Sequence, residues 1–235
     1  MIGAIRHKGF IPWDDDVDIE MPRPEYEKLV STFHDPSGRF KLFAPELGNS
    51  YLTYARVCDM EKTVAVPYYP WCQETTGVYI DIFAEEPVPD SIADLAERVK
   101  ICSRRNGRIY QIRGSKMHFD PNLGFVRNAK LLGKKILYGR KDIDKEISSF
   151  IGWLRSWDYD HTNYVGVMCS PLYGIREHHR KELFDNYIPV AFEDGMFLVA
   201  EGYDELLRNV YGDYMQLPPK EKQVPGHPEN SFFWK

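Results

Sequence analysis

The sequence predicts an α/β fold of the α+β kind: a mixed β-sheet core flanked by helices, with a helical middle and C-terminal portion. Short β-branched and aromatic segments dominate the first third of the chain, whereas residues 91–157 follow helical spacing. With 235 residues and 43% hydrophobic content, the chain can form one substantial core. We expect one compact domain with three parts: a sheet core in residues 1–90, a basic helical region in residues 91–160, and residues 161–235 packing back on the core.

Local periodicity and turn residues predict the individual elements. Residues 16–21 are expected to form a strand, followed by a helix over residues 24–33 with Pro24 in its first turn. Further strands are expected at residues 40–44, 51–58, 62–68, 78–83 and 164–169. Glycines and a proline should interrupt the helical region at Gly107, Gly114, Pro121 and Gly139. A hairpin around residues 193–195 and a helix over residues 203–211 complete the chain.

The most informative segment is PWDDDVDI, residues 12–19, which places four carboxylates within five positions. Strand alternation puts Asp16 and Asp18 on one face and leaves Val17 for the core. Clustered carboxylates repel one another unless a cation is bound, and oxygen ligands of this kind suit Mg²⁺ or Mn²⁺. We therefore predict a metal site at Asp16 and Asp18, with Asp14 just outside the ligand shell.

Two other interpretations of this segment compete with the metal site. A solvated acidic turn is the commonest form of a run of charges. A calcium-binding EF-hand loop would use Asp14, Asp16, Asp18 and Glu25, but its sharp turn requires glycine where the chain has Ile19. The EF-hand is therefore excluded, and the solvated turn stays open.

A further carboxylate, Asp81, lies inside the apolar strand predicted at residues 78–83. Burying an isolated carboxylate is costly unless it is neutralised, paired or bound to metal. If this strand lies beside residues 16–19, Asp81 joins Asp16 and Asp18 as a metal ligand and can accept the proton of an attacking hydroxyl. The alternative is a surface salt bridge at the end of a strand.

Candidate contacts to a phosphate or nucleotide are basic or hydroxyl side chains near these acids. Arg6, His7 and Lys8 lie between Gly3 and Gly9, a pattern that lets the backbone approach a phosphate closely. Arg56, Lys62 and Thr63, on paired strand candidates, are further possible donor contacts.

Charge is distributed unevenly along the chain. Residues 98–145 contain 14 Lys and Arg against three acids, although the whole chain has a net charge of −5. This basic region is either a solvated helix surface or a cradle for an anionic acceptor or an anionic membrane. The acidic balance of the whole chain and the lack of a recognition motif argue against nucleic acid as a partner.

The rest of the composition indicates a cytoplasmic protein. No apolar run approaches the roughly 20 residues of a membrane span, and residues 1–10 lack the apolar stretch of a secretory signal. The four cysteines are widely spaced, as expected of buried free thiols. A zinc site formed by Cys58, Cys72 and either His178 or His179 is the alternative.

Several of these segments together resemble the LicD-type phosphotransferases, the group that includes fukutin and fukutin-related protein. The segments are GAIRHKGFIPWDDDVDI (3–19), YIDIF (79–83), YDELL (203–207), YGDYM (211–215) and LPP (217–219). The resemblance implies a nucleotidyltransferase-type core in which Asp16, Asp18 and Asp81 are the catalytic, metal-binding carboxylates and Arg6, His7 and Lys8 contact the nucleotide. It also implies a metal-dependent reaction that moves a phosphorylated alcohol, such as phosphocholine or a polyol phosphate, from a CDP-activated donor to a sugar hydroxyl of a cell-surface glycan.

One feature of the family is missing from the chain as given. Family members have a helix and a Gly-Thr or Gly-Ser turn directly before the segment that matches residues 3–9, and the chain starts at Met1. We expect this form to bind a CDP-alcohol weakly or not at all. Two rival functions remain: a nucleotidyltransferase that uses CTP, and a catalytically inactive module that binds a glycan or a partner protein.

Overall fold

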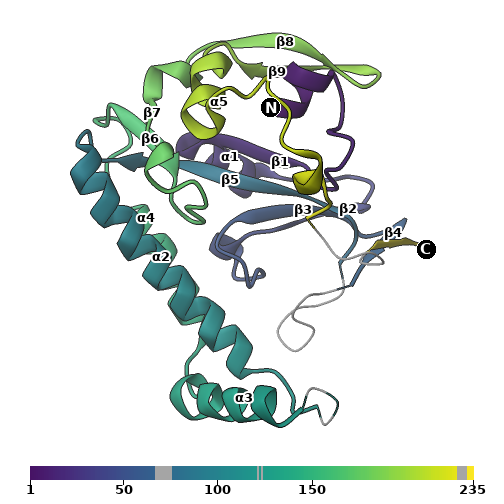
Figure 1. The fold of residues 1–235 in the computed structure, drawn as a ribbon, viewed down its shortest axis with the longest axis vertical. Helices are drawn as coiled ribbons and strands as arrows, with labels where there is room; N and C mark the ends of the chain where they lie inside the picture. The colour runs from purple at the N-terminus through teal and green to yellow at the C-terminus, as the bar shows by residue number, and fades with distance from the viewer. Residues whose placement is uncertain (67–75, 121, 123, 227–231) are drawn as a thin grey trace.

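The computed structural model describes residues 1–66, 76–120, 122, 124–226 and 232–235. A body built on the sheet carries an arm of helices that extends away from it (Figure 1). The α/β fold is confirmed, while the division at residues 90 and 160 stays a prediction. None of the helices in the described ranges combines the length and the apolar character needed to cross a bilayer.

The main sheet is mixed, as predicted. Its strands lie in the order β2 (Phe40–Phe43), β3 (Ala55–Asp59), β5 (Tyr79–Val88), β6 (Tyr164–Val167) and β7 (His179–Arg180), and neighbours in this series run antiparallel. Strand β1 (Asp18–Pro22) pairs with β5 in parallel. The chain segment that carries the acidic motif therefore lies directly beside the strand that carries Asp81.

Helix α1 (Arg23–Thr32) covers one face of this sheet. Strand side chains that do not face α1 lie on the other face. Tyr26 is buried among side chains that include Ile82 and Ala84 of β5. Arg23, at the start of α1, donates to Glu86 of β5 and to Glu46. Since strand side chains alternate, Asp81 and Glu85 lie on the face away from α1.

The helical region consists of α2 (Ile92–Ser115), α3 (Gly124–Tyr138) and α4 (Ile143–Leu154). The predicted interruption at Gly107 is wrong, because α2 continues through it. One glycine inside a helix costs about 1 kcal/mol, which the burial of Cys102 and Ile109 against α4 outweighs. Gly139 does end α3, and Pro121 lies outside the described residues.

The C-terminal part returns to the body, as Figure 1 shows. Strands β8 (Tyr187–Phe192) and β9 (Gly195–Ala200) form the predicted hairpin, and α5 (Tyr203–Tyr211) has the predicted bounds. The hairpin contacts a short π-helix, Gly3–His7, at the other end of the chain. Strand β10 (Phe232–Trp234) pairs with β4 (Thr63–Ala65). Short 3₁₀ helices occur at Pro45–Leu47, Gly174–Arg176, Lys181–Phe184 and Lys220–Lys222.

Several strand boundaries differ from those predicted. Residues 16–17 and 51–54 are not part of strands, whereas β5 continues to Val88, and β7 and β10 were not expected. Strand β5 passes through Glu85, Glu86 and Pro87, which are residues typical of a loop, because its neighbours on both sides pair with it there. The predicted strand over residues 62–68 is shorter at Thr63–Ala65, and residues 67–68 lie outside the described chain.

Candidate active site

Asp18 and Asp81 are direct register partners in the parallel pair of β1 and β5. The pairing extends beyond β1, since the backbone N–H of Asp81 donates to the carbonyl of Val17 at 3.1 Å. Because paired residues of adjacent strands point to the same face, both carboxylates lie on the side away from α1. The structure thus brings together two of the three predicted carboxylates on one face of the sheet.

The acidic segment before β1 is bent, so its carboxylates meet differently from the prediction. Asp14, Asp15 and Asp16 each place a carboxylate oxygen within 4.8 Å of those of the other two. Among the described residues, this group rather than Asp16, Asp18 and Asp81 reaches that mutual distance. Asp14 is therefore inside the compact group, and Asp15, which strand alternation left out, belongs to it.

The ionised form of Asp18 is destabilised by its surroundings. Burial, together with the negative charges of Asp16 and Asp81, raises the pKa of Asp18 to about 7. Burial and the charge of Asp16 also raise the pKa of Asp14. A set of hard oxygen ligands whose ionised form is destabilised in this way matches the chemistry of Mg²⁺ or Mn²⁺, which relieves the repulsion.

Arg56 occupies both oxygens of Asp81. Its Nε donates to Oδ1 at 2.6 Å and its Nη2 donates to Oδ2 at 2.9 Å, and both residues are buried. The pairing follows from the antiparallel register of β3 and β5, in which Arg56 and Asp81 are partners. Arg56, predicted as a donor contact, is therefore bound to a predicted catalytic residue.

The basic segment at the start of the chain is held by the C-terminal part. Arg6 donates to the carbonyl of Tyr214 at 2.8 Å and to Nε2 of His7 at 2.9 Å. Glu193, in the turn between β8 and β9, accepts from the backbone N–H of Phe10 at 2.8 Å and donates from its own N–H to the carbonyl of Lys8.

Two features of this segment follow from its contact with the hairpin. A Cβ added at Gly9 would lie 2.2 Å from Oε1 of Glu193, so a larger residue there would displace the Glu193 carboxylate from its hydrogen bond to Phe10. Lys8 has a φ of 61° and an exposed side chain, and its carbonyl accepts from the N–H of Glu193. Of the three predicted phosphate contacts, Lys8 is the most open to a ligand.

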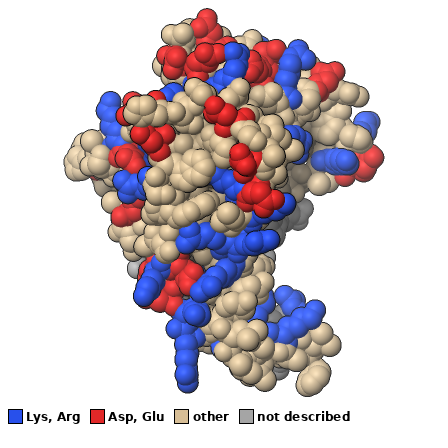
Figure 2. Space-filling view, turned by 90° about the vertical axis from the view of Figure 1, so that its left-hand side faces the viewer, with Lys and Arg blue, Asp and Glu red and all other residues tan. Residues whose placement is uncertain are grey.

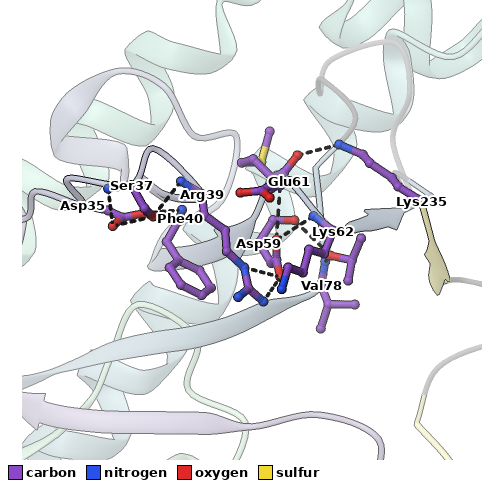
Figure 3. A network of polar contacts seen from close by, with 11 residues as sticks. Asp35, Ser37, Arg39, Phe40, Asp59, Glu61, Lys62, Val78 and Lys235 are labelled. Carbon is purple, nitrogen blue, oxygen red and sulfur yellow. Dashed lines mark hydrogen bonds and ion pairs between the residues drawn. The ribbon is translucent and has the colours of Figure 1, made fainter.

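Lys62 belongs to a separate polar network around Asp59 (Figure 3). Thr63 is bound to the same residue. Asp59 accepts from Arg39 and from the backbone N–H of Lys62. The hydroxyl of Thr63 donates to the carbonyl of Asp59 and accepts from the N–H of Val78. These contacts tie the turn after β3 to the residue before β5, and they occupy the Thr63 hydroxyl that was predicted to meet the donor.

The alternative zinc site finds no support in the described part of the chain. Cys58 is buried on β3. His178 stacks on Tyr164 with the ring centroids 4.0 Å apart, and Nε2 of His179 lies 3.5 Å from Oε2 of Glu177. Cys72 lies outside the described residues.

Comparison with protein families identifies the part of the chain that holds this site. Residues 1–95 match the model of the LicD/FKTN/FKRP nucleotidyltransferase domain. These residues contain the carboxylates of Asp14, Asp15, Asp16, Asp18 and Asp81. Residues 1–95 are a LicD-family nucleotidyltransferase domain.

The similarity to a curated relative extends beyond the LicD domain. The chain is 29% identical over 236 residues to the lipopolysaccharide cholinephosphotransferase LicD of Haemophilus influenzae, across 99% of this chain and 85% of that protein. No solved structure gave a significant match. The helical arm and the C-terminal part, which the LicD domain model does not cover, are thus included in the similarity to this relative.

The structure adds acidic residues that the sequence did not single out as part of the site. Glu20 follows Asp18 on the same face of β1, Glu85 lies on that face of β5, and Glu177 precedes β7. Glu85 and Glu177 are almost completely buried. Strand alternation from Asp18 to Glu20 and from Asp81 to Glu85 was the sequence signal that these two glutamates share the face of the site. Glu177 comes close to them only through the pairing of β6 and β7.

Proposed function

We propose that this chain is a metal-dependent phosphotransferase that moves phosphocholine from a CDP-activated donor to a sugar hydroxyl of a cell-surface glycan. One observation carries the proposal: Asp18 and Asp81 are register partners beside the compact carboxylates of Asp14, Asp15 and Asp16, within a LicD domain. The relative's activity as a cholinephosphotransferase supports phosphotransfer as the reaction.

Mg²⁺ or Mn²⁺ would be held by Asp14, Asp15 and Asp16 together with Asp18. When bound, the ion neutralises the charge of the donor's diphosphate. Lys8 adds a positive charge for the same group, and Arg6 is held beside it. Phosphoryl-type transfer needs mainly such charge neutralisation and in-line positioning from the protein.

Asp81 is proposed to accept the proton of the attacking sugar hydroxyl. The hydroxyl oxygen forms a bond to the phosphorus of phosphocholine, the bond from that phosphorus to the oxygen bridging to CMP breaks, and CMP leaves. Each carboxylate oxygen has a second lone pair, so Asp81 can accept a proton while Arg56 holds its orientation. Arg56 is thus a positioning residue for Asp81.

The test compares two reactions with the same protein. Incubation with CDP-choline, Mg²⁺ and a lipopolysaccharide acceptor should release CMP, and Asp16→Ala and Asp81→Ala should each abolish the release. Incubation with CTP and phosphocholine, scored for pyrophosphate, should give none. Pyrophosphate release without CMP release would favour a nucleotidyltransferase, and glycan binding that survives both substitutions without any turnover would favour an inactive binding module.

We also propose that the basic region, residues 98–145, contacts an anionic membrane through α3. Figure 2 shows Lys and Arg side chains gathered on the helical arm. The outer face of α3, defined by Phe125, Val126, Leu132, Ile136 and Leu137, consists of apolar residues that are 51–87% exposed. Leu131, on the opposite side of the helix, is buried.

The composition of α3 favours a lipid surface as the occupant of this face. Arg127, Lys130 and Lys134 flank the apolar residues, and α3 has no acid in its first turn. An apolar face bordered by cations is typical of helices that lie in the interface of anionic membranes. We place the protein on the cytoplasmic side of this membrane, because Cys58, Cys102 and Cys169 are free thiols, as expected in a reducing compartment.

A further inference from the structure

Two residues that carry a side chain adopt a left-handed backbone in the described part of the chain, and they are bonded to each other. Lys8 has a φ of 61°, and Glu193, in the turn between β8 and β9, has a φ of 53°. The backbone N–H of Glu193 donates to the carbonyl of Lys8 at 2.8 Å. This conformation is disfavoured for residues with a Cβ, so it persists where the surrounding structure holds it, and such positions cluster at functional sites.

The turn itself does not account for a glutamate at position 193. Phe192 and Gly195 are register partners, so Glu193 and Asp194 form a two-residue turn. Such turns favour glycine, asparagine or aspartate where φ is positive. The side chain of Glu193 instead reaches the start of the chain, where Oε1 accepts from the backbone N–H of Phe10 at 2.8 Å. Glu193 therefore binds the basic segment through both its backbone and its carboxylate.

Aromatic rings pack the hairpin against the same segment. The rings of Phe10 and Phe192 meet edge to face with centroids 5.0 Å apart, and Phe192 meets Phe197 of β9 in the same way at 5.9 Å. A Cβ added at Gly9 would collide with the carboxylate of Glu193, so the two segments approach each other closely. The bonds of Glu193 are thus part of a packed contact between the hairpin and residues 8–10.

The C-terminal part holds the basic segment at a second point. Nη1 of Arg6 donates to the carbonyl of Tyr214 at 2.8 Å, and the hydroxyl of the buried Tyr214 donates to Asp204 of α5 at 2.8 Å. Lys8 lies between these two anchors, and its side chain is exposed. The anchors therefore fix the backbone that carries Lys8 and leave its ammonium group open to a ligand.

A ring contact joins this segment to the acidic residues. The rings of His7 and Trp13 meet edge to face with centroids 5.8 Å apart. The N–H of Asp14 donates to the carbonyl of Ile11 at 2.9 Å, so the chain turns between the two segments. Since His7 and Trp13 directly precede Lys8 and Asp14, their contact keeps Lys8 near the carboxylates that are proposed to hold the metal ion.

We propose that Glu193 is a positioning residue for phosphate binding, which holds Lys8 in the conformation from which its ammonium group meets the diphosphate of the CDP-activated donor. This inference rests on the proposed function and deepens it, because it gives the β8–β9 hairpin, which lies outside the matched LicD domain, a part in donor binding. Ordering a flexible segment on binding lowers affinity, so a backbone that is already held in place improves it.

The test measures the Kd of CDP-choline by calorimetry, and its KM and kcat in the transfer reaction. Glu193→Ala removes the bond to Phe10, so Kd and KM should rise about tenfold while kcat stays within about threefold. Glu193→Gln keeps an oxygen that can accept from Phe10 and should stay within about threefold of the wild type in Kd and KM. Asp194→Ala removes the other carboxylate of the same turn and is the matched control, with Kd and KM unchanged.

A double-mutant cycle separates positioning of Lys8 from a general loss of structure. Lys8→Ala removes the ammonium group, and in this background Glu193→Ala should cause no further loss of affinity for CDP-choline. Two losses that multiply in the double variant would show that the residues act independently and would overturn the proposal. An unchanged Kd in Glu193→Ala would overturn it as well.

Glu193→Gly covers the case in which Glu193→Ala folds poorly. Glycine accepts the positive φ of the turn without strain while it removes the carboxylate. The melting temperature should therefore stay close to that of the wild type, and the affinity for CDP-choline should still fall about tenfold. A Glu193→Gly variant that binds CDP-choline as tightly as the wild type would refute the positioning role.

The outcome for Glu193 can be separated from the outcome for the proposed reaction. Inorganic pyrophosphate with Mg²⁺ presents a diphosphate without the nucleoside or the alcohol, and its calorimetric titration requires no turnover. If the wild type releases no CMP from CDP-choline, the proposed reaction fails, but the wild type should still bind pyrophosphate about tenfold more tightly than Glu193→Ala. Equal affinities of the two proteins for pyrophosphate would refute the role of Glu193, whether or not CMP is released.

Discussion

Arg56 and Asp81 form a buried pair through two hydrogen bonds between adjacent antiparallel strands. The guanidinium group also lies over the ring of Tyr79, with Cζ 3.3 Å from the ring centroid. The proposed proton acceptor is therefore held in one orientation by a residue that lies 25 positions earlier in the chain. This pair connects the stability of the sheet to the geometry of the site.

Replacing Arg56 should destabilise the protein strongly. Arg56→Met leaves Asp81 buried without its partner, and we expect a loss of about 3 kcal/mol or more in the free energy of unfolding. Arg180→Met removes two exposed ion pairs, with Glu182 and Glu205, and should cost less than about 1 kcal/mol. Urea denaturation of both variants measures the difference in free energy of unfolding. Equal losses would show that the Arg56–Asp81 pair stabilises the protein no more than an exposed ion pair does.

Metal binding should depend on pH through Asp18. Its pKa of about 7 in the metal-free protein exceeds the value of about 4 in an unfolded chain, so its contribution to stability is complete below pH 4 and is lost as pH rises through 7. Mg²⁺ must displace this proton. We expect roughly tenfold tighter Mg²⁺ binding at pH 8 than at pH 6, with proton release at pH 6.

Calorimetric titration in two buffers of different ionisation enthalpy measures both the affinity and the released protons. Asp18→Asn lacks the titrating carboxylate, so its weaker Mg²⁺ binding should vary much less between the two pH values. Binding by the wild type that is equally tight at pH 6 and pH 8, with no proton released, would contradict the role given to Asp18.

Two glycines that the sequence does not distinguish should respond oppositely to alanine. A Cβ at Gly166 in β6 would lie 2.1 Å from the backbone oxygen of Glu177, so Gly166→Ala must displace that segment and should cost about 2 kcal/mol or more. Gly152 in α4 has no atom within 4 Å of an added Cβ, and Gly152→Ala should stabilise the helix by about 0.5–1 kcal/mol. Chemical denaturation measures the free energy of unfolding of both variants. A Gly166→Ala variant as stable as the wild type would disprove the close approach of Gly166 to the backbone of Glu177.

The sequence predicted the elements whose signals are local. The bounds of α5 were recognised because helical spacing ends directly before Gly212, which has a φ of 70°. Asp18 and Asp81 were each assigned to a strand because apolar alternation surrounds them, and the pairing of the two strands was stated as a condition. The parallel pairing of those strands then confirmed the shared face.

The remaining features depend on contacts between distant residues. Alternation placed Asp16 in a strand, but β1 begins only at Asp18, so the preceding residues bend and gather Asp14, Asp15 and Asp16. The bond between Arg56 and Asp81 depends on the register of β3 with β5, which turn chemistry alone did not specify. The residue types around Glu85 are typical of a loop, so the strand was not expected to reach it. Its strand partners, Pro22 and Val167, are far away in the sequence and leave no local signal.

The outer face of α3 should bind the protein to anionic membranes. Phe125→Glu and Ile136→Glu each remove a large apolar contact with lipid and add a charge that anionic lipid repels, so we expect at least a tenfold loss of affinity from either change. Leu172 is an equally exposed apolar residue outside α3, at 81%, and Leu172→Glu is the matched control. Co-sedimentation with vesicles that contain phosphatidylglycerol, compared with vesicles of phosphatidylcholine alone, measures the affinity. If the outer face instead joins two copies of the chain, the α3 variants will abolish a concentration-dependent dimer in the absence of lipid and leave sedimentation with vesicles unchanged.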